Sequence, residues 1–479
     1  MSNDAYVPHP DRLLPADPAV REIARGLYEL EKDQPIVSPH GHVDPRLLLD
    51  DEPFRDPTSL FITPDHYVNR LLHARGVDLA DLGVGQGPLD ETASRRAWSL
   101  LAEHWHAYAG TPSRYWMEHE FHEVFGLETV LNPRTADAMY DAIAEQLTRP
   151  EFRPRALFDQ FKIRVMATTD DPVDDLAPHD ALAADDAFTG RVIPTFRPDK
   201  YLEPGRADFR ALTDALGEAA GVDAGTYDGH LEAMRIRRLY FRDHGAVSSD
   251  HAHIDPGTER LAEEDARRLY AAARGGEISA AEATALRRHL LADQARLAAE
   301  DGLVMTLHPA VSRNHSEAMF ERFGADVGFD IPVAVDFVHH LRPMLNDVGH
   351  APNFRTVLFT IDETVFSREI APLAGVYPSV YAGAPWWFID APDAILRYRR
   401  AVSETIGYSR TSGFIDDTRA FCSIPARHDM ARRLDATHLA GLVAEHRMRH
   451  EDAAELVATL PEQQPREVFR LGDAAGEKN

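Results

Sequence analysis

The sequence has little cysteine and no long apolar run, and both absences exclude classes of protein. It contains one cysteine in 479 residues, Cys422, which cannot form an internal disulfide or a thiolate metal cluster. A rare cysteine fits a reducing compartment, so we expect a cytoplasmic protein. The opening residues lack the basic and apolar regions of a signal peptide, and no window of about 18 residues is uninterruptedly apolar. We therefore expect neither export nor a membrane span.

Basic charge is also in short supply. The chain has 51 Lys and Arg residues against 78 Asp and Glu residues, a formal net charge of −27. Nucleic acids and anionic membranes are bound by neutralising phosphates, so neither is an expected partner. No glycine-rich phosphate loop stands between a strand and a helix, and no Gly-x-Ser-x-Gly segment is present. We therefore expect no nucleotide cofactor and no α/β-hydrolase nucleophile.

The hydrophobic fraction of 44% and the charged fraction of 27% are typical of a folded protein. Short apolar runs predict strands at 36–37, 163–167, 191–195, 245–248, 303–307, 356–361, 379–382 and 413–415. Helical spacing recurs between most of them, as in 19–30, 135–147 and 281–299. The alternation predicts an α/β fold, and eight units predict a closed (β/α)8 barrel of the TIM type rather than an open sheet.

The uneven spacing of the predicted strands divides the chain into four parts. Residues 1–48 hold a first helix and the first barrel strand. Residues 49–158 are too long for one crossover and rich in aromatics and histidine, which predicts a helical insertion after the first strand with a small core of its own. Residues 159–460 hold the rest of the barrel, with extra helices at 251–302. Residues 461–479 lack periodicity and are expected to fray.

Ionisable side chains follow the predicted strands, at the rim where parallel barrels carry their chemistry. His40 and His42 follow the first strand, and in an extended chain both imidazoles face the same side and can bind one divalent ion. Asp417 ends the last strand, which barrel closure brings beside the first. Asp417 can complete a His-His-Asp ligand set, act as an acid or base, or cap the following helix. His251 and His253 form a similar pair after the fourth strand, and their role stays open.

Three further strand ends carry candidates for substrate contact. Arg197 is suited to clamping a carboxylate or phosphate, although a salt bridge to Asp199 is an equal alternative. His308 adds an acid/base candidate, and Arg313 a further donor. The run Trp386-Trp387-Phe388 either packs the rim or forms an aromatic wall against a sugar face.

A series of short segments extends across nearly the whole chain in one order. They are Lys32-Asp33-Gln34-Pro35-Ile36 with His40-x-His42, Asp65-His66-Tyr67, Thr168-Thr169-Asp170-Asp171-Pro172, Arg197-Pro198-Asp199-Lys200, Ser249-Asp250-His251, Asp326-Val327-Gly328-Phe329-Asp330, Trp386-Trp387-Phe388, Asp417-Thr418-Arg419 and Arg427-His428. In these segments the chain resembles the uronate isomerases, a branch of the amidohydrolase superfamily of metal-binding (β/α)8 barrels.

The resemblance implies an aldose–ketose isomerase that converts D-glucuronate to D-fructuronate, D-galacturonate to D-tagaturonate, or both, by proton transfer from C2 to C1 through an enediol. It implies that His40, His42 and Asp417 hold a divalent ion, zinc by ligand type, which supports the developing oxyanion. Asp417 would also exchange a proton during ring opening. Ser38-Pro39 stand where family members usually carry an acidic residue and an aromatic, which leaves the preferred sugar acid open.

The resemblance also gives roles to the remaining candidates. Those roles are proton handling for Tyr67 and His308, binding or polarising the uronate carboxylate for Arg197 and Arg419, contacts to substrate for Asp250 and Arg313, and an aromatic wall for Trp387. We also expect a homo-oligomer. The second hypothesis is a metal-dependent hydrolase of the same superfamily that acts on a lactone, amide or ester of a sugar acid. The third is a sugar-acid-binding protein without turnover, which fold alone never excludes.

Overall fold

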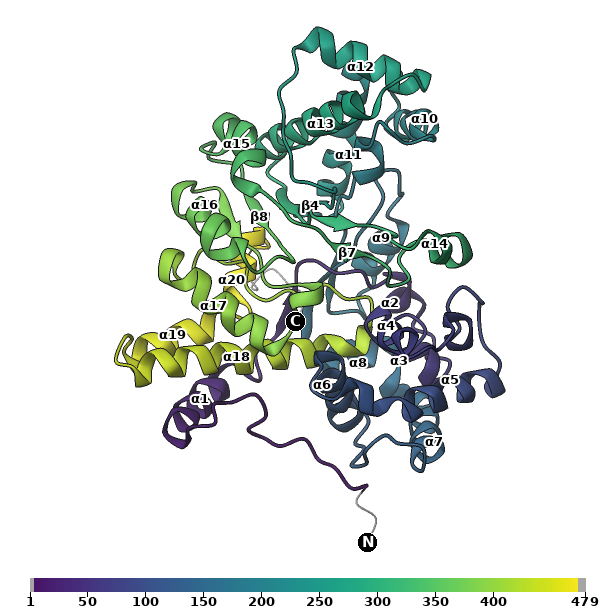
Figure 1. Ribbon diagram of the computed structural model, residues 1–479, viewed down its shortest axis with the longest axis vertical. Helices are drawn as coiled ribbons and strands as arrows, with labels where there is room; N and C mark the ends of the chain where they lie inside the picture. The colour runs from purple at the N-terminus through teal and green to yellow at the C-terminus, as the bar shows by residue number, and fades with distance from the viewer. Residues whose placement is uncertain (1–3, 473–479) are drawn as a thin grey trace.

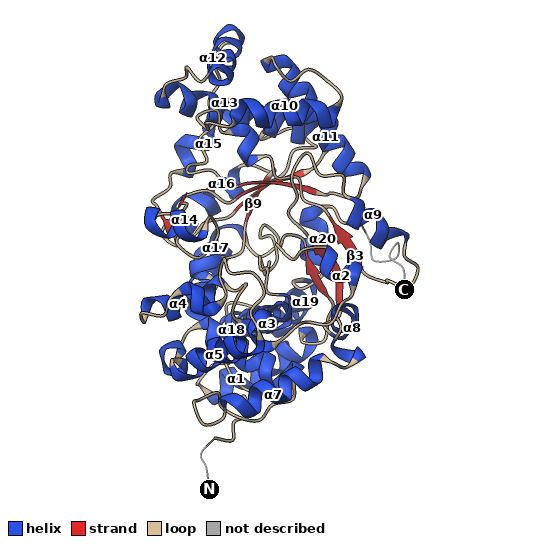
Figure 2. Cartoon of the chain, turned by 90° about the vertical axis from the view of Figure 1, so that its right-hand side faces the viewer, coloured by secondary structure: helices blue, strands red, loops and turns tan. Residues whose placement is uncertain are grey.

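The computed structural model describes residues 4–472 and has its parallel strands in the middle of the molecule with helices around them (Figure 1 and Figure 2). One parallel sheet has the order β1-β2-β3 and a second has the order β4-β5-β8-β9. Their bounds are β1 Ile36–Ser38, β2 Ile163–Ala167, β3 Arg191–Ile193, β4 Ser248–His251, β5 Val304–Leu307, β8 Thr356–Leu358 and β9 Val380–Ala382. A small antiparallel pair joins β6 (Val311–Ser312) to β7 (Ile331–Pro332). The prediction of an α/β fold with parallel strands is confirmed.

Isolated pairings connect the two sheets. Phe196, just after β3, bridges to Ser249 in β4, and Thr411 bridges to Ala382 in β9. The backbone N–H of His42 donates to the carbonyl oxygen of Thr418 at 3.0 Å. The loop after β1 therefore contacts residues 411–418, which we call the last extended segment. Within residues 4–472, regular ladders form the two sheets separately and do not close a ring.

Two predicted strands differ from the structure. The fourth was expected at 245–248, but β4 extends through Asp250 and His251, because its ladder with β5 uses backbone groups and tolerates polar side chains. The eighth, at 413–415, forms no strand. Gly413 and Asp417 have φ values of +77° and +41°, and such left-handed residues interrupt an extended chain.

The chain between β1 and β2 is helical. Its helices are α2 (Arg46–Asp50), α3 (Pro57–Phe61), α4 (His66–Ala74), α5 (Glu91–Glu103), α6 (Pro112–His119), α7 (Ala136–Leu147) and α8 (Pro154–Gln160). The expectation that this segment has a core of its own is wrong. Trp98 and Phe121 belong to the same buried cluster as Ile36 of β1 and Met166 of β2, because the helices bury their apolar faces directly against the sheet.

The remaining helices surround the strands, with α10 to α13 gathered at one end of the molecule in Figure 1. Their bounds are α1 Pro18–Glu31, α9 Ala177–Ala184, α10 Phe209–Ala220, α11 Tyr227–Asp243, α12 Glu263–Gly275, α13 Ala280–Asp301, α14 Glu317–Phe323, α15 Phe337–Val348, α16 Ala371–Val376, α17 Pro392–Ile406, α18 Ile424–Ala444, α19 His450–Thr459 and α20 Gln463–Phe469. Local signals set these ends: α13 begins with a capping box of Ser279 and Glu282 and ends at Gly302 with φ of +82°.

The expectation that 461–479 frays is wrong within the described part of that segment. Val468 and Phe469 of α20 are fully buried and share a cluster with Val37 of β1 and Val304 of β5. A helix of seven residues is too short to show a helical period in the sequence, but its apolar residues still fill the space beneath the strands. Residues 473–479 lie outside the described residues.

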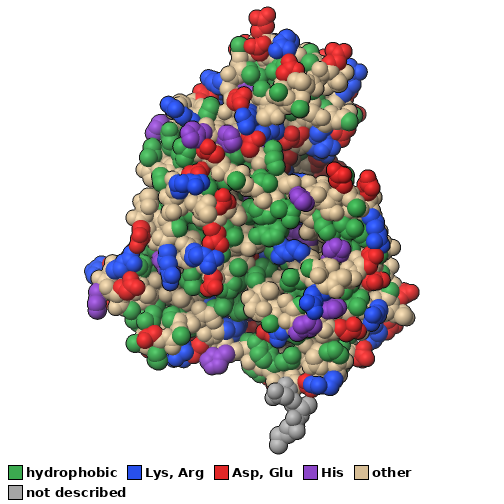
Figure 3. All heavy atoms as spheres, in the orientation of Figure 1, with side chains coloured by type: hydrophobic (Ala, Val, Ile, Leu, Met, Phe, Trp, Pro, Cys, Tyr) green, Lys and Arg blue, Asp and Glu red, His purple; other side chains and the backbone are tan. Residues whose placement is uncertain are grey.

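The surface carries both signs of charge. On the face drawn in Figure 3, acidic and basic side chains are interspersed rather than gathered into separate fields. None of the helices within residues 4–472 combines the length and the apolar character that a membrane crossing requires.

The buried ion pair between α17 and α18 makes a prediction for stability. Arg399 donates to both carboxylate oxygens of Asp435 at 2.5 and 2.7 Å, and each side chain is 5% exposed. Asp435→Ala leaves the guanidinium buried without its partner, so we expect the free energy of unfolding to fall by about 3–5 kcal/mol. Urea unfolding followed by tryptophan fluorescence measures the change.

The control uses a second arginine of α17, Arg397. Arg397 forms a similar two-bond pair with Glu363, but those side chains are 56% and 32% exposed. Glu363→Ala should therefore lower the free energy of unfolding by less than about 1 kcal/mol. Equal losses in the two variants would contradict the account of the buried pair.

Candidate active site

A cavity of about 400 Å³ lies at the carboxyl ends of the parallel strands. In folds with parallel strands, the loops at this edge carry the functional side chains. The cavity is lined by every residue proposed from the sequence for catalysis, substrate contact or metal binding, namely His40, His42, Tyr67, Arg197, Asp250, His308, Arg313, Trp387, Asp417 and Arg419. These residues come from the segments that follow β1, β3, β5 and β9, from β4 itself, from α4 and from the last extended segment.

His40, His42 and Asp417 converge on one point of the cavity. Nε2 of His42 lies 2.9 Å from Oδ1 of Asp417, and Nε2 of His40 lies 3.5 Å from the same oxygen. The hydrogen bond from His42 N–H to the Thr418 carbonyl holds the two loops together. Asp417 has φ of +41°, a left-handed conformation that costs about 1 kcal/mol and that tends to occur at functional sites.

This donor set fits a divalent metal ion. Nε2 of His40 and Nε2 of His42 both face Oδ1 of Asp417, which is buried. Burial lowers the pKa of His40 to about 4, so its ring is neutral near pH 7. Burial alone would raise the pKa of Asp417, but the facing imidazoles of His40 and His42 hold it well below its ordinary value. Neutral imidazoles and an ionised carboxylate are the ligands that zinc-like ions prefer.

His308 lies against this group. Its ring stacks on the His40 ring, with centroids 4.7 Å apart, and one ligand atom each from His40, His308 and Asp417 lie within 4.8 Å of one another. Nε2 of His308 is buried and has no hydrogen-bond partner within residues 4–472. His308 can therefore either accept a proton or serve as a further ligand.

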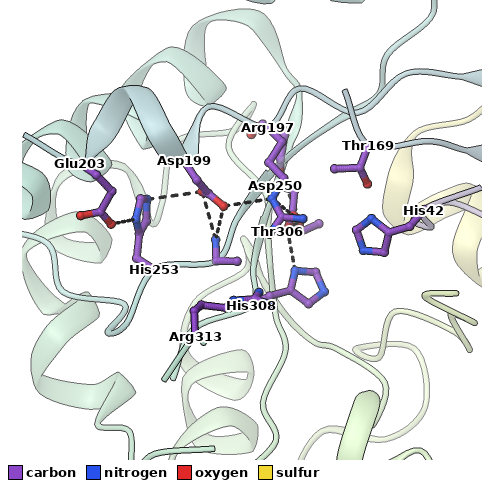
Figure 4. Close-up of polar contacts among 12 residues, drawn as sticks. His42, Thr169, Arg197, Asp199, Glu203, Asp250, His253, Thr306, His308 and Arg313 are labelled. Atoms are coloured by element: carbon purple, nitrogen blue, oxygen red, sulfur yellow. Dashed lines mark hydrogen bonds and ion pairs between the residues drawn. The ribbon is translucent and has the colours of Figure 1, made fainter. Parts of the chain in front are cut away.

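Asp250 holds His308 in place from the other side (Figure 4). Its Oδ1 accepts hydrogen bonds from Nδ1 of His308 at 2.6 Å and from Oγ1 of Thr306 at 2.8 Å, and its Oδ2 lies 3.5 Å from Nε of Arg197. Burial opposes the ionisation of Asp250, but His308, His40 and Arg197 hold its pKa well below the usual range. The bond to Asp250 fixes the Nδ1–H tautomer of His308 and leaves the lone pair of Nε2 free to act as a base.

Aromatic rings form one wall of the cavity. The His66 ring lies between Tyr67 and Trp387, with centroids 4.7 and 5.5 Å away. Burial raises the pKa of Tyr67 above its ordinary value, opposed by the guanidinium of Arg427, which lies 4.8 Å from the centroid of the Tyr67 ring. The phenol therefore keeps its proton near pH 7. Trp387 has φ of +52°, a second left-handed residue at the rim.

The two arginines proposed for the carboxylate have different surroundings. Nε of Arg197 donates to Asp199 at 3.0 Å and lies near Asp250, so its charge is already paired. Arg419 lines the cavity, is exposed and forms no hydrogen bond or ion pair with any residue from 4 to 472. An incoming anion therefore meets an unpaired cation at Arg419.

Some lining residues received no role from the sequence. Asp330 accepts from the Asn314 backbone at 2.7 Å and from Arg313 at 2.9 Å, and so fixes the loop that carries Arg313. Asp330 and His66 lie in segments that carried the family resemblance, so those segments were the available signal. Arg206 stands in no motif, and nothing in the sequence singled it out.

Comparisons with known proteins show which family the chain is similar to. A family model described as glucuronate isomerase matches residues 18–469, a range that includes all the candidate residues. The curated uronate isomerase of Cutibacterium acnes is 54% identical over 471 residues, which cover 98% of this chain and 100% of that protein.

Solved structures show the same likeness. The glucuronate isomerase of Caulobacter crescentus is similar with a TM-score of 0.94 at 42% identity, over 97% of each chain. The uronate isomerase of Thermotoga maritima has a TM-score of 0.90 at 27% identity, and the match covers 97% of this chain and 99% of that one.

Proposed function

This chain belongs to the glucuronate isomerase family, and on that premise we propose that it isomerises a hexuronate between its aldose and ketose forms. The substrates are D-glucuronate, converted to D-fructuronate, D-galacturonate, converted to D-tagaturonate, or both. The observation that carries the proposal is the convergence of His40, His42 and Asp417 in a cavity that also exposes the unpaired cation Arg419. Its volume of about 400 Å³ is ample for a six-carbon sugar acid.

The reaction needs protons to be moved without any change in composition. The sugar ring opens when the hydroxyl on C1 loses its proton and becomes a carbonyl, while the bond from C1 to the ring oxygen breaks and that oxygen, on C5 or C4, gains a proton. The hydrogen on C2 then leaves as a proton, an enediol forms, and a proton is added at C1 while the oxygen on C2 becomes a carbonyl. A group that exchanges protons must therefore stand beside C1 and C2, and cations must face the oxygens.

The charge state and hydrogen bonds of each side chain indicate which proton it transfers. Asp417 exchanges the proton of ring opening, because its carboxylate stays ionised and faces the cavity. Nε2 of His308, kept free by the bond from Nδ1 to Asp250, accepts or returns a proton at carbon. Tyr67 keeps its phenolic proton and can donate it to oxygen.

The other lining residues bind and orient the substrate. Arg419 pairs with the uronate carboxylate, and Arg197, held by Asp199 and Asp250, polarises an oxygen nearby. Asp250 has a second oxygen, Oδ2, that can accept from a sugar hydroxyl. Arg313 lies 5.3 Å from the centroid of the Trp387 ring, and the two close the aromatic side of the cavity.

His40, His42 and Asp417 would hold a divalent ion, and their ligand types favour zinc. When bound, the ion supplies a Lewis acid that stabilises negative charge on oxygen during enediol formation. The convergence of two imidazole nitrogens on the buried Oδ1 of Asp417 supports this assignment.

The architecture supports a finer description of the fold. The two sheets are parts of one (β/α)8 barrel, with α2 to α8 inserted after its first strand. The bridges at Phe196 and Thr411 and the bond from His42 to Thr418 support this proposal.

We also propose that the protein is cytoplasmic and forms a homo-oligomer. The presence of a single cysteine, Cys422, supports the location, because disulfides are rare in reducing compartments.

The reaction itself is tested with a panel of hexuronates followed by NMR in deuterated water. We expect a ketose isomer to appear with no mass change beyond the incorporation of solvent deuterium at C1 or C2, because protons at carbon are exchanged during the reaction. Net addition of water to a lactone, amide or ester would instead establish the hydrolase hypothesis. Binding without turnover at stoichiometric protein would establish the third.

Asp417→Asn tests the proposed metal centre. We expect turnover to fall below detection, because a charged ligand is removed. Loss of a residue that only hydrogen-bonds to a metal ligand lowers metal affinity about 10–100-fold, so zinc affinity should fall by more than that. The control is Asp416→Asn, which removes the adjacent carboxylate, buried against Nε2 of His428 at 3.1 Å and outside the cavity. This control should keep its zinc. Equal zinc affinity in both variants would remove Asp417 from the ligand set.

Arg419→Met tests the carboxylate contact. A hydrogen bond to a charged group contributes about 1.5–3 kcal/mol, so we expect KM to rise about 10–100-fold with a smaller change in kcat. Arg206→Met is the control, because Arg206 also lines the cavity but is held by two 2.8 Å bonds to Asp208. Its KM should change less than about threefold. If KM rises in the control and not in Arg419→Met, the substrate carboxylate lies elsewhere.

A further inference from the structure

A second group of metal-ligating side chains lies beside the proposed active site. Asp199, His251 and His253 each offer one ligand atom, and these atoms lie within 4.8 Å of one another. Asp199 begins the short helical turn Asp199–Leu202 after β3, whereas His251 ends β4 and His253 follows it. The imidazoles are buried, with exposures of 1% and 4%. The proposed roles in isomerisation use neither His251 nor His253, and they use Asp199 only to hold Arg197.

The two rings present nitrogens without partners. Nδ1 of His253 donates to Glu203 at 2.6 Å, which fixes the tautomer and leaves the lone pair of Nε2 free. Nε2 of His251 lies 3.3 Å from Oγ of Ser249, so Nδ1 is its remaining nitrogen. Nε2 of His253 and Nδ1 of His251 are both buried without a hydrogen-bond partner in the described part of the chain. Leaving such groups unsatisfied costs about 1–3 kcal/mol each.

Asp199 is oriented toward the same point. Its Oδ2 accepts from Nε of Arg197 at 3.0 Å, and the backbone N–H of Ala252 donates to Oδ1 at 3.1 Å. Oδ1 lies 3.6 Å from Nε2 of His253. Ligands of a tetrahedral zinc ion stand about 3.3 Å apart, so an ion can enter with small shifts of the side chains.

The surroundings also resemble those of a metal ligand. Histidines that bind metal almost always donate their other ring nitrogen to a carboxylate or carbonyl, and Glu203 supplies that carboxylate for His253. The rings of His251 and His253 are nearly parallel, at 24°, with their centroids 6.4 Å apart. Figure 4 shows Glu203, His253 and Asp199 in a row that continues to Arg197 and Asp250.

We propose that Asp199, His251 and His253 form a second site for a divalent ion of the zinc class, separate from the one at His40, His42 and Asp417. Two imidazoles and a carboxylate leave a fourth position for water. The site is linked to the cavity through Arg197, which contacts both Asp199 and Asp250. An ion there fixes Asp199 and thereby the position of the Arg197 guanidinium.

Metal content of the zinc-loaded protein tests the proposal. The protein is incubated with zinc chloride, freed of excess by gel filtration and measured by inductively coupled plasma mass spectrometry. We expect two ions per chain in the unaltered protein and one in His253→Ala, which loses a ligand. The matched control is His230→Ala, since His230 is also buried and neither of its ring nitrogens has a partner among residues 4–472. The control should keep two ions.

A second comparison does not depend on the folding of His253→Ala. Asp417→Asn should retain one ion if the second site exists and none if it does not. One ion in the unaltered protein together with none in Asp417→Asn would overturn the proposal and show the three residues to be a buried polar network. The same result would leave the isomerase function intact, because the first centre would still be filled and turnover would persist.

Discussion

The hydrogen bond from the backbone of His42 to that of Thr418 brings the two ends of the sequence together. Two imidazoles from the loop after β1 and a carboxylate from the segment that holds Thr418 meet where this contact holds their loops side by side, and Arg432, which donates to the carbonyls of Lys32, Gln34 and Pro35, ties the same parts of the chain together. The regular ladders do not provide it, since β1 pairs with β2 and the last segment pairs with β9 at Thr411 alone. The proposed centre therefore depends on contacts between loops and helices in addition to the regular ladders of the sheets.

Buried charged side chains around the cavity contact more than one partner each. Arg197 neutralises Asp199 and Asp250, and Asp250 in turn orients His308. Each buried carboxylate thus has a cation or several donors, which offsets the cost of its desolvation. Strained backbone accompanies this network at Trp387 and Asp417, both left-handed. The remaining fold, with its continuous apolar clusters, stabilises these unfavourable local conformations.

Sequence reasoning reached the residues whose chemistry is local and missed features that depend on distant contacts. Apolar runs located β1, β2, β5, β8 and β9 because strands buried on both faces are continuously apolar. The same rule failed for β4, whose Asp250 and His251 are polar, and for 413–415, where Gly413 turns the chain. The short helix α20 could not be predicted, because only its contact with the strands explains it. The free state of Arg419 likewise depends on its three-dimensional surroundings, whereas the pairing of Arg197 with Asp199 was one of the two alternatives that the sequence offered.

Anomalous diffraction from a crystal of the zinc-loaded protein, recorded on both sides of the zinc absorption edge, tests the central claim most directly. The account predicts a peak bounded by the ring nitrogens of His40 and His42 and the carboxylate of Asp417, at bond lengths of about 2.0–2.2 Å. A map with no peak among these three side chains, in a crystal that binds zinc elsewhere, would contradict it.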